Sequence, residues 1–126
     1  MSSVESHEAL YALLGRAGES KPLASGSVVF EKGDPGEVMY VLTSGSVDLL
    51  DGDRVVATVE SPGLFGEMAL IVSKQRSLGA VVHDDAELVE ISSRAFWILV
   101  HETPYFARLV MRVMADRLRR ANSAIT

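Results

Sequence analysis

The sequence predicts a mainly β fold, a jelly-roll-like β-roll with helices at both ends. Between residues 21 and 92, short apolar segments alternate with turns rich in glycine, aspartate and proline, as all-β rolls require. On either side of this region the apolar residues recur at helical spacing. Because 126 residues suit one domain, we expect a single domain with an N-terminal helical segment (1–20), a β-roll (21–92) and C-terminal helices (93–126).

The first helix is expected over residues 6–14, where Leu10, Leu13 and Leu14 recur at helical spacing before Gly15 ends the run. The β region then contains about eight short strands by pattern. The clearest candidates are residues 28–30, 38–42, 47–50, 55–59, 78–82 and 87–91. The pair Asp51-Gly52 is a hairpin signal between two of them.

Two helices are expected after the strands. The first begins at Ser93 and carries Phe96, Trp97 and Val100 on an apolar face. The second restarts at Thr103-Pro104 and runs to the end of the chain. It has two apolar stripes, one made of Phe106, Leu109, Val110 and Val113, which we expect to pack on the roll. The other contains Ala107, Met111, Met114, Leu118, Ala121 and Ile125, at the spacing of a coiled-coil seam. That seam suggests a homodimer through parallel helices, or else both stripes pack within one subunit.

Composition excludes several classes of function. A net charge of -5 argues against broad nucleic-acid binding, although five arginines gather in the last helix. No apolar run approaches the roughly 20 residues that a membrane span needs. The absence of cysteine excludes disulfides and thiolate metal sites, and the N-terminus lacks the pattern of a signal peptide. We therefore expect a cytoplasmic protein with no nucleic acid and no membrane among its partners.

The segment 64–77, with the sequence L-F-G-E-M-A-L-I-V-S-K-Q-R-S, has the chemistry of an anion site. Gly66 permits close backbone approach, and the apolar run after Glu67 suits one turn of buried helix, whose N-terminus favours phosphate. Arg76 offers a bidentate contact to phosphate oxygens. Glu67 would repel phosphate, so we expect it to accept hydrogen bonds from a neutral sugar hydroxyl. These residues indicate a ligand with one phosphate beside a ribose.

The sequence G-E-M-A-L followed by R-S, with Glu67 and Arg76 nine positions apart, resembles the phosphate-binding cassette of cyclic-nucleotide-binding domains of the catabolite activator protein and protein kinase A regulatory subunit type. The resemblance implies a double-stranded β-helix with an N-terminal helix and two C-terminal helices. It assigns Glu67 to the ribose 2′-hydroxyl and Arg76 to the cyclic phosphate, and favours cAMP weakly over cGMP as the ligand, with no other cofactor. The residues Gly26, Gly33, Gly36, Tyr40 and Gly45 fall at family positions, and we interpret all four glycines as turn formers.

By the same resemblance, Leu49 and Leu64 approach the purine, the backbone of Met68 and Ala69 faces the ligand, and Ser77 binds phosphate. Arg117 falls where a relative has an arginine reaching the nucleotide-binding glutamate, although a solvated arginine is an equal interpretation. The expected ligand-binding residues are Leu49, Leu64, Phe65, Gly66, Glu67, Met68, Ala69, Arg76, Ser77, Arg117 and Asn122.

Two positions depart from the family pattern. Ala121 stands where a relative has a threonine that contacts the adenine amino group, so we expect Asn122 or Ser123 to make that contact instead. Leu78 replaces an alanine, and its larger side chain would crowd the pocket behind the phosphate.

Taken together, these residues predict a non-catalytic sensor that couples ligand binding to movement of its C-terminal helix and acts on an unidentified protein partner. Its Met-Ser-Ser start slightly favours a free-standing sensor over a fragment of a larger protein. Two alternatives stay open: an interaction module that binds no ligand, and a small cupin-like enzyme. His7, His83 and His101 lie in separate elements and lack metal-ligand spacing, which disfavours the metal-dependent cupin. A further alternative is purely structural: Glu67 and Arg76 form a salt bridge that holds the loop in place and bind no ligand.

Overall fold

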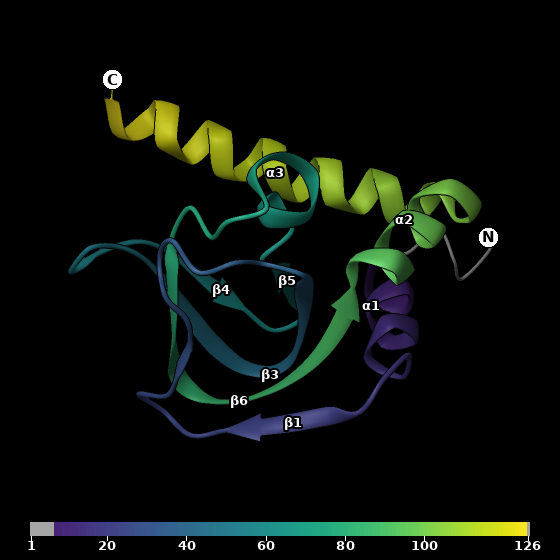
Figure 1. The fold of residues 1–126 in the computed structure, drawn as a ribbon, viewed down its shortest axis with the longest axis horizontal. Helices are drawn as coiled ribbons and strands as arrows, with labels where there is room; N and C mark the ends of the chain where they lie inside the picture. Colours follow the sequence, from purple (N-terminus) through teal and green to yellow (C-terminus); the bar gives the residue numbers. More distant parts are fainter. Residues whose placement is uncertain (1–6, 126) are drawn as a thin grey trace.

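A computed structural model describes residues 7–125, except the side chains of Ser73 and residues 123–125. The elements in chain order are α1 (His7–Gly15), β1 (Ser20–Leu23), β2 (Val28–Phe30), β3 (Val38–Asp51), β4 (Arg54–Glu60), β5 (Gly63–Phe65), the short helix η2 (Ala69–Ser73), β6 (Gly79–Ser92), α2 (Ser93–Glu102) and α3 (Pro104–Ile125). Figure 1 shows the antiparallel strands as a curved roll, with α1 and α2 at one end and α3 crossing above it. The predicted fold class is confirmed.

The roll is organised around two long antiparallel strands, β3 and β6. The strand order is β1-β6-β3-β4, with β2 pairing on β6 and β5 pairing on β3. The described residues therefore contain six strands rather than about eight. Segments 38–42 and 47–50 are both parts of β3, and segments 78–82 and 87–91 both fall in or at the start of β6.

Gly45 explains why β3 continues where the sequence predicted a turn. Its φ is 81° and the pairing with β6 shifts register around it. A Cβ at this position would lie 2.1 Å from the carbonyl oxygen of Asp85. The glycine therefore lets β3 bend closely against β6 without ending, so the interpretation of Gly45 as a simple turn residue is wrong.

Two apolar clusters form the core. The first lies inside the roll and contains Leu42, Val47, Leu49, Val59, Phe65, Ala80, Val82, Ala86 and Leu88. The second joins the roll to all three α-helices and contains Leu10, Leu14, Met39, Val41, Leu64, Val89, Ile91, Phe96, Phe106, Leu109 and Val110. The predicted packing of the first α3 stripe is confirmed, with Val113 partly buried beside it. In α2 the core position belongs to Phe96, whereas Trp97 is 47% exposed, contrary to its expected place on the apolar face.

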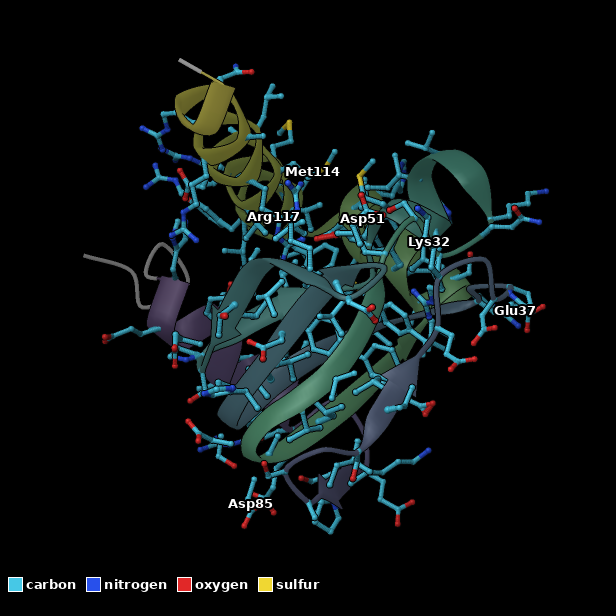
Figure 2. All side chains as sticks on the ribbon, turned by 90° about the vertical axis from the view of Figure 1, so that its left-hand side faces the viewer. Lys32, Glu37, Asp51, Asp85, Met114 and Arg117 are labelled. Carbon is cyan, nitrogen blue, oxygen red and sulfur yellow. The ribbon has the colours of Figure 1, made fainter. Side chains whose placement is uncertain are left out.

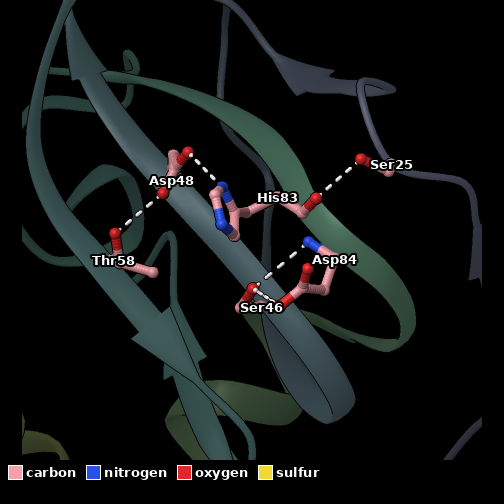
Figure 3. A network of polar contacts seen from close by, with 6 residues as sticks. All are labelled: Ser25, Ser46, Asp48, Thr58, His83 and Asp84. Atoms are coloured by element: carbon pink, nitrogen blue, oxygen red, sulfur yellow. Dashed lines mark hydrogen bonds and ion pairs between the residues drawn. The ribbon is translucent and has the colours of Figure 1, made fainter.

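A polar network holds the strands together on another part of the roll (Figure 3). The Thr58 hydroxyl of β4 donates to Asp48 of β3 at 2.7 Å, and His83 Nδ1 of β6 lies 3.1 Å from the same carboxylate. Ser46 and Asp84 bond each other across β3 and β6. His83 thus lies within β6 and contacts β3. The described residues contain no group of three or more His, Asp or Glu side chains placed to hold a metal ion.

The second apolar stripe of α3 is left largely unpacked. Met111 and Leu118 are 62% and 63% exposed, Ala121 is exposed, and Ala107 and Met114 are partly buried. The side chain of Ile125 lies outside the described residues. The interpretation that both stripes pack within one subunit therefore fails for Met111 and Leu118. Across residues 7–125, no helix combines the length and apolarity needed to cross a membrane.

Candidate functional site

The site is built where β5 ends and the chain turns into η2. Gly66 has a φ of 83°, Glu67 follows it, and η2 forms a single wide turn that Lys74 closes in a left-handed conformation. One helical turn was predicted here, and Ala69 is buried as expected. The turn as a whole is less buried than predicted, because Val72 is 68% exposed and Met68 37%.

Arg76 lies buried at the other end of this loop, with 5% of its surface exposed. Its Nη1 donates to the Gly66 carbonyl at 2.9 Å and its Nη2 to the Val38 carbonyl at 2.7 Å. Its Nε is buried and has no hydrogen-bond acceptor among the described residues. Burial lowers the pKa of the Arg76 guanidinium, and nearby Tyr40 is the main group opposing that shift. The arginine thus keeps a buried donor that an anion could use.

Glu67 makes its ion pair with Arg117 of α3, not with Arg76. The carboxylate is 1% exposed, and Arg117 Nη1 contacts both of its oxygens, with 2.9 Å to Oε2. Arg117 Nη2 also donates to the Leu64 carbonyl at 2.5 Å. Figure 2 shows Arg117 between α3 and the roll. The interpretation of Glu67 and Arg76 as a loop-pinning salt bridge is therefore wrong, and so is that of Arg117 as a solvated residue.

A cavity of about 80 Å³ joins Glu67 to Arg76. It brings together most of the predicted site residues: Leu49, Gly66, Glu67, Met68, Ala69, Arg76, Ser77 and Arg117. Leu78 also lines it, consistent with the expectation that this side chain narrows the pocket. The Glu67 carboxylate and the Arg76 guanidinium therefore border one cavity.

Three predicted residues do not line this cavity. Leu64 is buried in the core, although its carbonyl holds Arg117. Phe65 is fully buried and stacks on Tyr40 with ring centroids 5.2 Å apart. Asn122 is exposed on α3, and the side chain of its alternative, Ser123, lies outside the described residues.

Sequence reasoning missed Phe30 and Gly36. Phe30 lines the cavity, and its ring centroid lies 4.2 Å from Arg76 Cζ. At Gly36 a Cβ would lie 2.4 Å from the Ala69 Cβ and 2.9 Å from Arg76 Cζ, so this glycine provides room for the site and is not a turn former. Gly26 and Gly33 have positive φ and open surroundings, as turn glycines do. No local pattern marks Gly36, because the groups that it accommodates lie more than thirty positions later.

Arg117 also borders a second, more open cavity of about 230 Å³. Its lining comes from α1, β4, β5 and α3, and includes Tyr11, Thr58, Leu64, Val113, Asp116 and Arg120. Burial raises the pKa of Tyr11, while the positive charge of Arg117 opposes this and Glu67 adds to it. Both charges of the ion pair therefore influence the pKa of Tyr11. Arg117 thus lines both cavities.

A β-roll with a buried arginine and a buried glutamate on one small cavity defines a ligand-binding domain. The chain belongs to the cyclic nucleotide-binding domain family, whose model matches residues 20–103. The cyclic AMP receptor protein of Thermus thermophilus is 34% identical over 102 residues, which cover 77% of this chain and 47% of that protein. The chain thus spans about half the length of this relative.

Solved structures agree with this assignment. The catabolite activator protein of Thermus thermophilus superposes with a TM-score of 0.77 and 26% identity, covering 98% of this chain and 62% of that one. A protein of a cyclic-GMP-dependent signalling pathway in bacterial phytopathogenesis gives a TM-score of 0.67 and 29% identity, covering 95% and 93% of the two chains. The similarity therefore extends over nearly the whole chain, helices included.

Proposed function

We propose that this chain is a non-catalytic sensor domain for a cyclic mononucleotide, with cAMP weakly preferred over cGMP. The observation that carries the proposal is the environment of Arg76, a buried guanidinium that makes no ion pair among the described residues and borders the same cavity as Glu67. A singly charged phosphodiester would supply the missing negative charge and accept from Nε. A fused ribose would bring its hydroxyl towards Glu67.

The other site residues have supporting roles in this proposal. Ser77 borders the cavity beside Arg76 and can donate its hydroxyl to a phosphate oxygen. Leu49 supplies an apolar wall for the purine, and the backbone at Met68 and Ala69 faces the sugar and phosphate. The core position of Leu64 limits its proposed role to holding Arg117 through its carbonyl.

Ligand binding in this proposal requires movement of Arg117. Small-molecule sites usually enclose about 300 Å³ or more, whereas this cavity encloses about 80 Å³. Arg117 already occupies the Glu67 oxygens that the ribose hydroxyl would use. The N-terminal half of α3 is anchored in the core by Phe106, Leu109 and Val110, whereas residues 118–122 are exposed. The half that contains Arg117 is therefore the part expected to re-dock, bringing Asn122 towards the base.

The partners of such a sensor are proposed from the surface of α3. The exposed Met111 and Leu118 suit a homodimer through parallel α3 helices. An unidentified downstream protein would bind the domain according to the position of α3. We further propose that residues 1–126 form one domain, and the expected cytoplasmic location rests on the sequence alone.

A thermal-shift panel tests the function directly. The purified protein is heated with cAMP, cGMP, AMP and cyclic dinucleotides, beside the Arg76→Glu variant as a matched control. We expect the cyclic mononucleotides to raise the melting temperature of the wild type, cAMP most, and to leave the variant unchanged, since ligand bound to the folded state stabilises it. A flat response to every nucleotide would favour the interaction module without ligand. Metal analysis of the same sample tests the alternative of a metal-dependent cupin-like enzyme, which would contain a bound metal ion.

A further inference from the structure

We propose that Phe30 is a positioning residue, whose ring fixes the plane of the Arg76 guanidinium and thereby selects one exocyclic oxygen of the ligand phosphate. This inference rests on the proposed function, because it concerns how the same cavity reads a cyclic phosphate. Phe30 lies at the end of β2, outside the segment 64–77 that carries the cassette pattern.

The central carbon of the Arg76 guanidinium lies over the Phe30 ring. Arg76 Cζ lies 4.2 Å from the Phe30 ring centroid, well inside the distance of about 6 Å at which a cation is attracted to an aromatic face. Tyr40 is farther from the same atom, at 5.7 Å. Because Arg76 is almost fully buried, water does not weaken this attraction as it would at an exposed site.

The Phe30 ring is itself held in place by other aromatic side chains. Its centroid lies 6.0 Å from that of Tyr40 and 6.1 Å from that of Phe65. Phe65 has no exposed surface and belongs to the core inside the roll. Phe30 is therefore a platform tied to the rigid core, which is what a positioning residue needs.

The remaining contacts of Arg76 hold two of its nitrogens and leave the third available. The carbonyls of Gly66 and Val38 accept from Nη1 and Nη2, whereas Nε has no acceptor among the described residues. Hydrogen bonds from a guanidinium are directed within its plane. The Phe30 ring, 4.2 Å from the central carbon of the guanidinium, restricts how far that plane can tilt and so how Nε can donate. Phe30 also lines the cavity that an anion would enter.

A cyclic phosphodiester has two exocyclic oxygens, one axial and one equatorial, which point in different directions. A guanidinium whose plane is fixed bonds one of them better than the other. A guanidinium free to tilt bonds either. The stereochemical preference of the site for these two oxygens consequently measures how firmly Phe30 holds Arg76.

The two phosphorothioate diastereomers of cAMP, Rp and Sp, place sulfur at one or the other of these oxygens and provide the measurement. Calorimetric dissociation constants are determined for both, and for cAMP, with wild type, Phe30→Leu, Phe30→Met and Phe30→Tyr. We expect a preference of about tenfold or more between diastereomers in the wild type. The preference should collapse towards unity in Phe30→Leu and Phe30→Met, with cAMP affinity falling about tenfold, and persist in Phe30→Tyr.

Several results would overturn the inference while leaving the proposed function intact. One is a wild type that binds cAMP but does not distinguish the diastereomers. Another is a preference that survives in Phe30→Leu or Phe30→Met, even if all affinities fall together, as a purely structural role for the ring would produce. Loss of the preference in Phe30→Tyr would also overturn the inference, because tyrosine keeps an aromatic ring at this position. A wild type that binds none of the three ligands instead refutes the proposed function, and this inference with it.

Discussion

Arg117 on α3 and Glu67 at the start of the cassette form an ion pair across fifty residues of sequence, with the carboxylate almost fully buried. The pair fastens α3 to the roll and closes one wall of the cavity that contains Arg76. The buried carboxylate is tolerated because Arg117 bonds both of its oxygens, and the guanidinium in turn donates to the Leu64 carbonyl. The same two residues therefore connect the wall of the cavity to the position of α3.

The first prediction concerns the energy of this pair. Arg117→Ala should lower the free energy of unfolding of the ligand-free protein by about 3 kcal/mol, since it leaves Glu67 charged and buried without its partner. Adding Glu67→Gln should recover much of the loss, because the uncompensated charge disappears. Urea unfolding of both single variants and the double variant measures this coupling. Arg120→Ala, at an exposed position on the same helix, should stay within about 0.5 kcal/mol of the wild type. Equal effects of Arg117→Ala and Arg120→Ala would contradict the prediction.

The second prediction assigns the phosphate contact. Arg76→Glu should abolish cAMP binding in calorimetry, because it replaces the buried hydrogen-bond donor with a carboxylate that repels the negatively charged phosphate. Glu67→Ala should weaken binding less, by about tenfold to a hundredfold, since it removes only contacts to a neutral hydroxyl. Arg108→Glu makes the same charge change at an exposed site on α3 and serves as the control. Unchanged affinity in Arg76→Glu would refute the site assignment.

Much of the fold and most of the site could be predicted because the informative residues are close together in sequence. The cassette contributes Gly66, Glu67 and Arg76 within one loop, and β5 and η2 need only local geometry to bring them to a common cavity. The helical stripe of Phe106, Leu109 and Val110 is likewise a periodic signal within one element. Short-range patterns of this kind report local structure directly.

What could not be predicted depends on contacts between distant segments. Gly45 was expected to form a turn, but its lack of a side chain lets β3 continue past Asp85 of β6, whose carbonyl oxygen would lie 2.1 Å from a Cβ. Phe30 and Gly36 contact Arg76 only because β2 and the following loop fold back over the cassette. Such positions are defined by tertiary packing, which a single sequence does not display.

The third prediction tests Gly36 as a space requirement. Gly36→Ala should weaken cAMP binding strongly and lower the melting temperature, because the new Cβ would meet Ala69 and Arg76 at 2.4 and 2.9 Å. Overpacking of this kind costs about 1–3 kcal/mol. Gly79→Ala is the matched control, since a Cβ there finds its nearest neighbour at 3.7 Å. Differential scanning fluorimetry and calorimetry on both variants give the comparison, and equal behaviour of the two would show that Gly36 is not needed for space.

The fourth prediction concerns the crowding side chain Leu78. Leu78→Ala should enlarge the cavity and raise cAMP affinity by about tenfold, while lowering stability because Leu78 packs on the core of the roll. The opposite signs of the two effects distinguish crowding from a general loss of structure. Val55→Ala removes a half-exposed apolar side chain away from this cavity and should leave affinity unchanged. Weaker binding in Leu78→Ala would mean that the leucine contacts the ligand favourably.

The fifth prediction addresses the exposed stripe of α3. Met111→Glu combined with Leu118→Glu should convert a dimer to a monomer in analytical ultracentrifugation, because each buried apolar side chain of this size contributes about 1.5–3 kcal/mol. Val55→Glu makes the same kind of change on β4 and should leave the dimer intact.

The charge of α3 predicts how salt affects this dimer. The helix carries one acidic residue, Asp116, and five arginines: Arg108, Arg112, Arg117, Arg119 and Arg120. Parallel α3 helices would therefore bring like charges together. Added salt screens that repulsion, and the wild-type dimer should therefore tighten as ionic strength rises. A wild type that sediments as a monomer at every protein and salt concentration would refute the proposed homodimer through α3.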